Sequence, residues 1–299
     1  MPLKVGRRFI VEPGGALHGD VQVPGDKSIS HRSVMLGSIA EGETRVEGFL
    51  EGDDAMATLA AMRALGVPIE GPDNGRLRIQ GVGLHGLQAA GSPLDLGNSG
   101  TSMRLFSGLL AGQPFVSELV GDASLMRRPM PRVTDPLTRM GARIGTASNG
   151  TAPLRIEPAP GLRGIDYEMP MASAQVKSAL LLAGLYAEGD TCVIEPAVTR
   201  DHTERMLTAF GVPVDVKGPR VRITGGASLT GGEVAVPGDI SSAAFFLVGA
   251  SIASQASVTL TNVGLNPTRT GVIDILQRMG ASIDIDARHT NAGEPVGKL

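Results

Sequence analysis

The spacing of apolar residues predicts a strand, a turn and a helix near the start of the chain. Val21 and Val23 alternate with polar neighbours, as in a half-buried strand, and Pro24-Gly25 marks a turn. From there to Ile39 the apolar residues follow a helical period. Polar residues occupy the start of this helix, so we expect its first backbone N–H groups to face solvent.

The start of this helix also combines the features of an anion site. Ser28 or Ser30 could cap the helix, and Lys27 and Arg32 add charge to an N-terminus that is already partly positive. An isolated motif of this kind is more often an ordinary capped surface helix. Recurrence of the pattern along the chain therefore decides between the two interpretations.

The pattern recurs about every 70 residues. The tetrapeptide Val-Pro-Gly-Asp at 23–26 returns at 236–239, and weaker relatives begin near 97 and 170. Each unit also ends alike, because a helical apolar period stops at a glycine: Gly66, Gly141, Gly211 and Gly280. A two-stranded hairpin is predicted after the first three of these glycines. One unit therefore reads strand, helix, strand, helix, hairpin.

These units predict an α/β (α+β) fold. Each holds a second helix, which Asp53 or Asp54 caps in the first unit and Asp201 opens in the third. Parallel strands joined by helices need covered sheets, so the helices should pack inside each domain. Equivalent helix starts in symmetrical repeats would converge, and would form a pocket for a ligand with two or three negative charges.

Composition limits the class of function. A formal net charge of −3 over 299 residues argues against a general binder of nucleic acid or membrane surfaces. The one cysteine, Cys192, excludes an intrachain disulfide, and no apolar run is long enough to cross a bilayer, so we expect a cytoplasmic protein. No metal or cofactor is expected, because the histidines lack ligand spacing and the G-x-G-x-x-G at 81–86 is not followed by a helix.

Five motifs, in order along the chain, carry a resemblance to a known family. They are PGDKSISHR from 24, LGNSGTSMR from 96, GDASLMRRPM from 121, MASAQVKS from 171 and TRDHTE from 199. Together they resemble EPSP synthase, the 3-phosphoshikimate 1-carboxyvinyltransferase of the shikimate pathway, which serves aromatic amino acid biosynthesis. The Ser-Ala-Gln at 173–175 is similar to the second bacterial class of that transferase.

The resemblance implies the enolpyruvyl transferase-like fold. That fold has two domains of βαβαββ units, each domain with a pseudo-threefold axis, and the substrates bind between them. Three units lie between the two Val-Pro-Gly-Asp copies, so we predict one complete domain at residues 21–235. Residues 1–20 would return to pack with 236–299 in an incomplete second domain.

The resemblance also implies the reaction and its residues. The family transfers the enolpyruvyl group of phosphoenolpyruvate to the 5-hydroxyl of shikimate 3-phosphate. Lys27 would contact both substrates and act in catalysis. Shikimate 3-phosphate would bind to Lys27, Ser28, Arg32, Ser173, Ala174, Gln175 and Arg200. Phosphoenolpyruvate would bind to Lys27, Gly100, Arg128 and Gln175. Glyphosate, which competes with phosphoenolpyruvate, would not be excluded by Gly100.

The chain departs from the family in length. Four units are recognisable where the family has six, and residues 287–299 are expected to form a loop or a frayed end. The family's catalytic Asp and Glu should lie in the missing part, so we expect these residues alone to be inactive until a C-terminal segment complements them. The alternatives are a non-catalytic phosphoshikimate-binding fragment and, on weaker motif agreement, the UDP-N-acetylglucosamine enolpyruvyl transferase.

Overall fold

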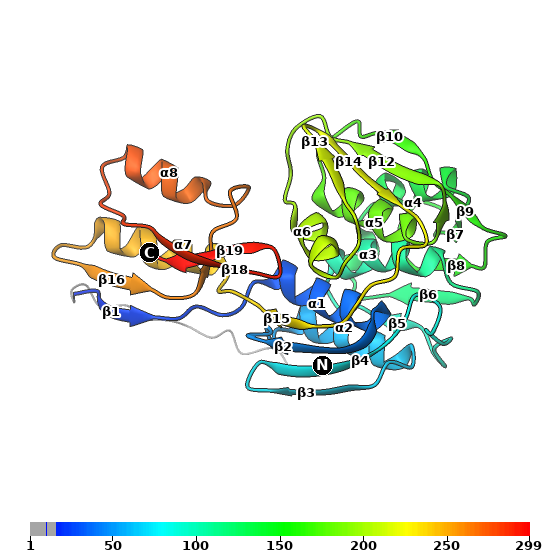
Figure 1. Cartoon of the computed structure of the whole chain (residues 1–299), viewed down its shortest axis with the longest axis horizontal. Helices are drawn as coiled ribbons and strands as arrows, with labels where there is room; N and C mark the ends of the chain where they lie inside the picture. The colour runs from blue at the N-terminus through cyan, green and yellow to red at the C-terminus, as the bar shows by residue number, and fades with distance from the viewer. Residues whose placement is uncertain (1–9, 11–15) are drawn as a thin grey trace.

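The chain folds into two lobes (Figure 1). This computed structural model describes residues 10 and 16–299, without the side chains of 287 and 288. We call residues 22–235 the larger lobe, and residues 16–21 with 236–299 the smaller lobe. The part of the predicted 1–20 segment at 1–9 and 11–15 lies outside the described residues. Among those described, no helix is long and apolar enough to span a membrane.

Three four-stranded sheets of identical topology form the outside of the larger lobe. In each sheet the first strand runs parallel to the second, and the last two strands are antiparallel to their neighbours. The first sheet has the order β15 (Glu233–Ala235), β2 (Glu41–Glu47), β4 (Arg76–Val82) and β3 (Ile69–Asp73). The second has the order β5 (Leu94–Asp95), β6 (Ser117–Val120), β8 (Leu154–Glu157) and β7 (Arg143–Gly145). The third has the order β10 (Asp166–Glu168), β12 (Asp190–Ile194), β14 (Arg220–Thr224) and β13 (Asp215–Lys217).

The hairpins predicted after the first three glycines are therefore confirmed, as β3–β4, β7–β8 and β13–β14. The first sheet is completed by its edge strand β15, which follows the third unit in the chain and pairs with β2. The larger lobe thus begins and ends in the same sheet. A short pair, β9 (Leu162–Arg163) with β11 (Ala187–Glu188), and a 3-10 turn, η1 (Leu125–Arg127), complete the lobe.

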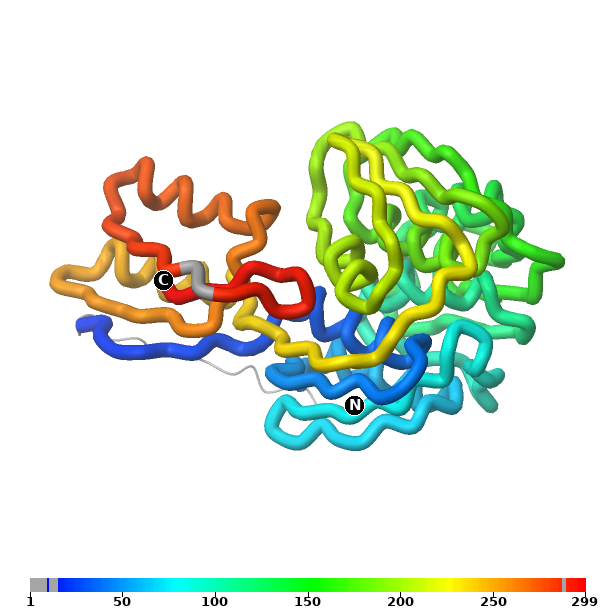
Figure 2. Tube along the Cα trace, viewed as in Figure 1, coloured from blue at the N-terminus to red at the C-terminus, as the bar shows by residue number. Residues whose placement is uncertain are grey.

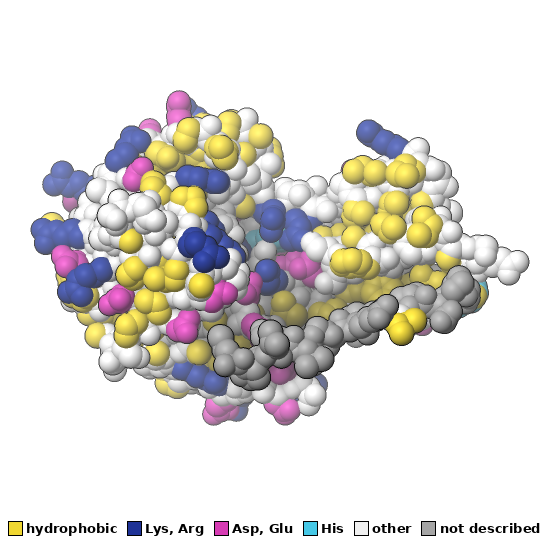
Figure 3. Space-filling model, turned by 180° about the vertical axis from the view of Figure 1, so that it is seen from behind, with side chains coloured by type: hydrophobic (Ala, Val, Ile, Leu, Met, Phe, Trp, Pro, Cys, Tyr) yellow, Lys and Arg dark blue, Asp and Glu magenta, His cyan; other side chains and the backbone are white. Residues whose placement is uncertain are grey.

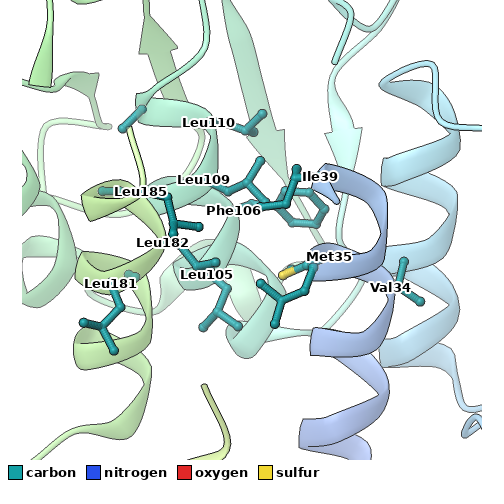
Figure 4. Close-up of a cluster of buried hydrophobic side chains, with 14 of the residues drawn as sticks. Val34, Met35, Ile39, Leu105, Phe106, Leu109, Leu110, Leu181, Leu182 and Leu185 are labelled. Carbon is teal, nitrogen blue, oxygen red and sulfur yellow. The ribbon is translucent and has the colours of Figure 1, made fainter. Parts of the chain in front are cut away.

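Three inner helices fill the space between the sheets (Figure 1). They are α1 (Lys27–Ile39), α3 (Gly100–Ala111) and α5 (Ala174–Gly184), and each is buried over most of its length. Figure 4 shows their apolar side chains in one cluster, with Met35, Phe106 and Leu182 from the three helices in turn. The outer helices are α2 (Asp53–Ala64), α4 (Pro131–Arg139) and α6 (His202–Ala209).

The inner helices are capped by residues just before their first turns. The side chains of Asp26, Ser99 and Ser173 accept hydrogen bonds from backbone N–H groups of α1, α3 and α5. The expected caps Ser28 and Ser30 were therefore wrong, because Asp26 already fills that role.

The expected cap of the second helix was also wrong. Asp53 and Asp54 lie inside the first turn of α2, whose cap position is Gly52. Acidic residues at that place still complement the partial positive charge of the helix start. The periodicity thus located the helix, and the two expected capping residues lie one and two positions after the actual cap position.

The smaller lobe contains two helices and two small sheets. Its helices are α7 (Ile240–Ile252) and α8 (Gly271–Arg278). The strand β1 (His18–Val21) runs parallel to β16 (Ser257–Leu260), and the second sheet has the order β17 (Val263–Gly264), β19 (Glu294–Lys298) and β18 (Asp286–Asn291). The apolar core of this lobe is separate from that of the larger lobe. The domain boundaries near residues 21 and 235 stay a prediction. The pairing of β1 with β16 and the separate apolar core favour it.

The expectation of a loop at 287–299 was wrong, because most of this segment forms the hairpin β18–β19. Ala292 and Gly293 both have positive φ at its turn, as a tight hairpin requires. One of its strands buries Val296 and also a carboxylate, Glu294. Because a charged residue occupies a buried position of this strand, the alternation of apolar and polar residues did not predict it. Figure 2 shows the hairpin tip reaching towards the larger lobe, where the Arg205 guanidinium donates to the Gly293 carbonyl at 2.9 Å.

Helix α7 leaves an apolar face uncovered. Phe245 and Ile252 are 82% and 81% exposed, and Figure 3 shows apolar side chains gathered on the smaller lobe. Contiguous apolar surface of this kind drives association in water.

We expect the 299-residue chain to self-associate through this face of α7. The double substitution Phe245→Ser with Ile252→Ser should shift it towards monomer in sedimentation velocity. Val216→Ser, at an exposed valine of the larger lobe, is the control. Equal self-association of all three proteins would contradict the expectation.

Candidate anion-binding site between the lobes

A cavity of about 410 Å³ opens where the starts of four helices meet. Residues from α1, α3, α5 and α6 line it, together with Thr268 of the smaller lobe, so the cavity lies between the lobes. The lining residues are Ser28, Arg32, Thr101, Ala172, Ser173, Ala174, Gln175, Thr199, Arg200, His202 and Thr268. None of them is a carboxylate.

The inner helices give this cavity a positive potential. Thr101 and Ala174 lie in the first turns of α3 and α5, and Ser28 lies in the first turn of α1. Each helix start carries a partial positive charge on its unpaired N–H groups. Three such starts around one cavity favour a bound anion.

Arg32 is the buried cation of the cavity. Its Nε donates to Thr203 Oγ1 at 2.7 Å, and its two terminal nitrogens donate to Ser178 Oγ at 2.8 Å and to the Ser28 carbonyl at 2.9 Å. Burial lowers its pKa to about 10, so the group stays charged at neutral pH. These partners accept three of its five N–H groups. No acceptor for the other two N–H groups is found within the described part of the chain, so they are available to a ligand.

Gln175 joins the cavity to a second cation, Arg104. Its Oε1 accepts from Arg104 Nη1 at 2.8 Å, and its Nε2 donates to Thr101 Oγ1 at 2.9 Å. These two bonds fix which end of the amide faces which neighbour. Burial, with the nearby charges of Arg132 and Arg128, lowers the pKa of Arg104.

Gly100 lies where two guanidinium groups approach the start of α3. A Cβ atom at this position would be 2.7 Å from Arg128 Nη1 and 2.8 Å from Arg104 Nη1. Asn98 accepts a hydrogen bond from Arg128 Nη2. Glycine is therefore the residue that lets both cations lie against the helix start.

Lys27 lies at the first position of α1 and is half-exposed. Its Nζ is 3.0 Å from Asp54 Oδ2 at the start of α2. The chain thus holds a paired lysine and carboxylate at the edge of the site.

The predicted site residues therefore fall into two groups. The cavity brings together Ser28, Arg32, Ser173, Ala174, Gln175 and Arg200. Lys27, Gly100 and Arg128 are outside its lining, and the latter two form a neighbouring cationic group with Arg104.

Sequence reasoning missed several members of the site. Arg104 stood in a quoted motif without a role, and its signal was its place in the second turn of an inner helix, as for Arg32. Thr268 and His202 gave no such signal, because one comes from the other lobe and the other resembles an ordinary helix residue.

Comparisons with known proteins identify the family of the chain. A family model described as EPSP synthase (3-phosphoshikimate 1-carboxyvinyltransferase) matches residues 11–298. The chain belongs to the EPSP synthase family. Proteins named 3-phosphoshikimate 1-carboxyvinyltransferase from Alkalilimnicola ehrlichii and Methylococcus capsulatus are each 66% identical to it over 97% of the chain.

A solved structure gives the same result for the fold. The EPSP synthase of Acinetobacter baumannii matches 96% of this chain with a TM-score of 0.91 and 57% identity. The predicted fold class is thereby confirmed. The chain covers 65% of that structure, and 65% and 67% of the two relatives. It therefore spans about two thirds of the length of these EPSP synthase relatives.

A buried polar chain beside the cavity connects α1, α2 and α3. His31 Nδ1 lies 2.7 Å from Thr58 Oγ1, which lies 2.7 Å from Ser102 Oγ. Burial and the charge of Arg32 lower the pKa of His31 to about 3, so the ring is neutral in the folded protein. The neutral ring lets a histidine lie next to the buried arginine.

This shift predicts a pH dependence of stability. Between pH 6.5 and about 3 the unfolded state binds a proton that folded His31 does not bind, so the free energy of unfolding falls as the pH falls. The slope from this group is at most about 1.4 kcal/mol per pH unit. We expect His31→Gln to flatten the acid limb of stability measured by urea unfolding from pH 7 to 4.5. The exposed His85→Gln is the control, and an unchanged slope in His31→Gln would refute the assignment.

Proposed function

We propose that the larger lobe binds shikimate 3-phosphate in the cavity between the lobes. The observation that carries this proposal is the buried Arg32, for which the described residues leave two N–H donors without a partner. It lies beside three helix starts, and no carboxylate lines the cavity. A phosphate dianion is the kind of ligand that such a site favours. Ser28, Ser173, Ala174, Gln175 and Arg200 supply the hydroxyl, amide, backbone and cationic contacts around it.

The second substrate, phosphoenolpyruvate, belongs on the neighbouring cationic group. Gly100 permits Arg128 and Arg104 to approach the start of α3, and Gln175 lies between that group and the cavity. Both substrates carry a phosphate and a carboxylate, so cations must offset their repulsion before they can react. Planar guanidinium groups suit carboxylate and phosphate, because they offer parallel N–H donors.

The whole family activity is the transfer of the enolpyruvyl group to the 5-hydroxyl, with release of phosphate. We propose this reaction for the protein in its family context, with Lys27 as a mobile cation that contacts both substrates. Proton transfers to the methylene carbon and from the hydroxyl need positioned acids and bases. Because the chain spans about two thirds of its relatives, a phosphoshikimate-binding fragment without turnover stays an alternative.

The sister transferase for a UDP-amino sugar fits less well. That family uses a reactive loop cysteine, whereas Cys192 is buried in β12 and 1% exposed. A buried unpaired thiol also suits a reducing compartment, which supports the proposed location in the cytoplasm.

Calorimetric titration with shikimate 3-phosphate tests the proposed site. We expect Arg32→Met to weaken binding by about 10- to 150-fold, because one charged hydrogen-bond donor contributes about 1.5–3 kcal/mol. Arg155→Met, at an exposed arginine of β8, should bind like the unchanged protein. Equal affinity of the Arg32 variant and the control would reject the site.

A second titration tests the phosphoenolpyruvate position. Gly100→Ala places a methyl group within 3 Å of two guanidinium nitrogens, so Arg104 and Arg128 must shift. We expect it to weaken glyphosate more than phosphoenolpyruvate, each titrated into protein saturated with shikimate 3-phosphate, because glyphosate is the longer ligand. Gly91→Ala, where a Cβ meets open space, is the control. Equal losses for both ligands would contradict the expectation.

A further inference from the structure

Lys177 is a fully buried lysine at the end of the first turn of α5. Its side chain is 1% exposed, and its Nζ lies 2.8 Å from Glu195 Oε2 and 2.5 Å from Glu204 Oε1. The Thr199 hydroxyl donates to the other oxygen of Glu195. Burial raises the pKa of Glu204, and the charge of Lys177 opposes that rise.

Stability alone does not account for this cluster. Removing an ion from water costs several kcal/mol, and well-packed apolar residues of similar volume are often as stable as a buried ion pair. A lysine with two carboxylates therefore suggests a requirement for fixed geometry at this place.

The cluster forms one of two adjacent links between α5 and α6. The first link is the ion pair from Lys177 to Glu204. The second link is between Ser178, which follows Lys177 in α5, and Thr203, which precedes Glu204 in α6. Their hydroxyl oxygens lie 2.7 Å apart. These two hydroxyls are the acceptors that orient the Arg32 guanidinium.

A third connection reaches the other cation of the cavity. Glu195 follows β12, and its hydrogen bond with Thr199 restrains the segment between β12 and α6. Arg200 is the next residue of that segment and lines the cavity. Lys177 is thus one contact away from the supports of both Arg32 and Arg200.

We propose that Lys177, with Glu195 and Glu204, is a positioning residue that orients Arg32 and Arg200 towards an anionic ligand in the cavity. Lys177 itself does not line the cavity. The anion's identity as shikimate 3-phosphate rests on the proposed function, whereas the orientation of Arg32 does not.

The test uses the 299-residue chain and three variants. Lys177→Met removes the cation, Glu204→Leu removes one link and leaves one cation with one carboxylate, and Glu204→Gln keeps an oxygen acceptor. The readouts are hydrogen exchange at the Arg32 Nε–H by ¹⁵N NMR, assigned with Arg32→Lys, and calorimetric binding of shikimate 3-phosphate. The buried Leu154→Ala, in the second sheet, is a matched control for general loss of stability.

We expect Lys177→Met and Glu204→Leu to speed the exchange and weaken binding by about tenfold or more, the size of a lost charged hydrogen bond. Glu204→Gln should stay within about threefold of the unchanged protein, and Leu154→Ala should retain both properties. If Lys177→Met does not fold, Glu204→Leu decides, because it leaves no unpaired buried carboxylate.

Slow Arg32 exchange and full binding in Glu204→Leu would overturn the proposal. Equal losses in Leu154→Ala would also overturn it, since the effect would then be one of stability. Fast exchange in Glu204→Leu, together with no binding by the unchanged protein, would uphold the positioning of Arg32 and reject shikimate 3-phosphate as the ligand.

Discussion

Electrostatic repulsion at the shared end of three inner helices is the constraint on which the larger lobe depends. The starts of α1, α3 and α5 meet, and each helix carries a cation within its first two turns: Arg32, Arg104 and Lys177. Like charges and aligned helix starts at one place are unfavourable unless an anion or a buried partner offsets them. The three sheets and the apolar cluster hold these helices together in spite of this repulsion, so the unfavourable charge is available to a ligand.

The partners of these cations explain their different roles. Arg32 and Arg104 donate to hydroxyl, carbonyl and amide oxygens, which fix their direction, and no carboxylate of the described residues forms an ion pair with them. Lys177 contacts two carboxylates, so its charge is neutralised inside the protein. The two guanidinium groups thus have neutral partners, whereas the buried ammonium of Lys177 has carboxylate partners.

Most of the larger lobe could be predicted from the sequence, because local signals are strong there. Each unit repeats the apolar period and ends a helix at a glycine such as Gly66 or Gly211, both of which have positive φ. The hairpin β18–β19 could not be predicted in this way, since buried Glu294 is held by His202 Nδ1 at 2.6 Å and by Asn266 Nδ2 at 2.8 Å. The cavity was also predicted only in part, because tertiary contacts bring some of its members together. Contacts between residues far apart in sequence, such as Gln175 with Arg104, leave no periodic trace.

The repeated Val-Pro-Gly-Asp motif has a consequence for how the lobes meet. Asp26 caps α1 and Asp239 caps α7, and Arg269 contacts Asp26 Oδ2 at 3.3 Å and Asp239 Oδ1 at 3.0 Å. Gly25 and Gly238 of the two copies also form a bridge between the lobes. One arginine, 11% exposed in its side chain, thus joins the caps of two helices that belong to different lobes. Because Thr268 lines the cavity and precedes this arginine in the chain, the same contact sets where the smaller lobe meets the cavity.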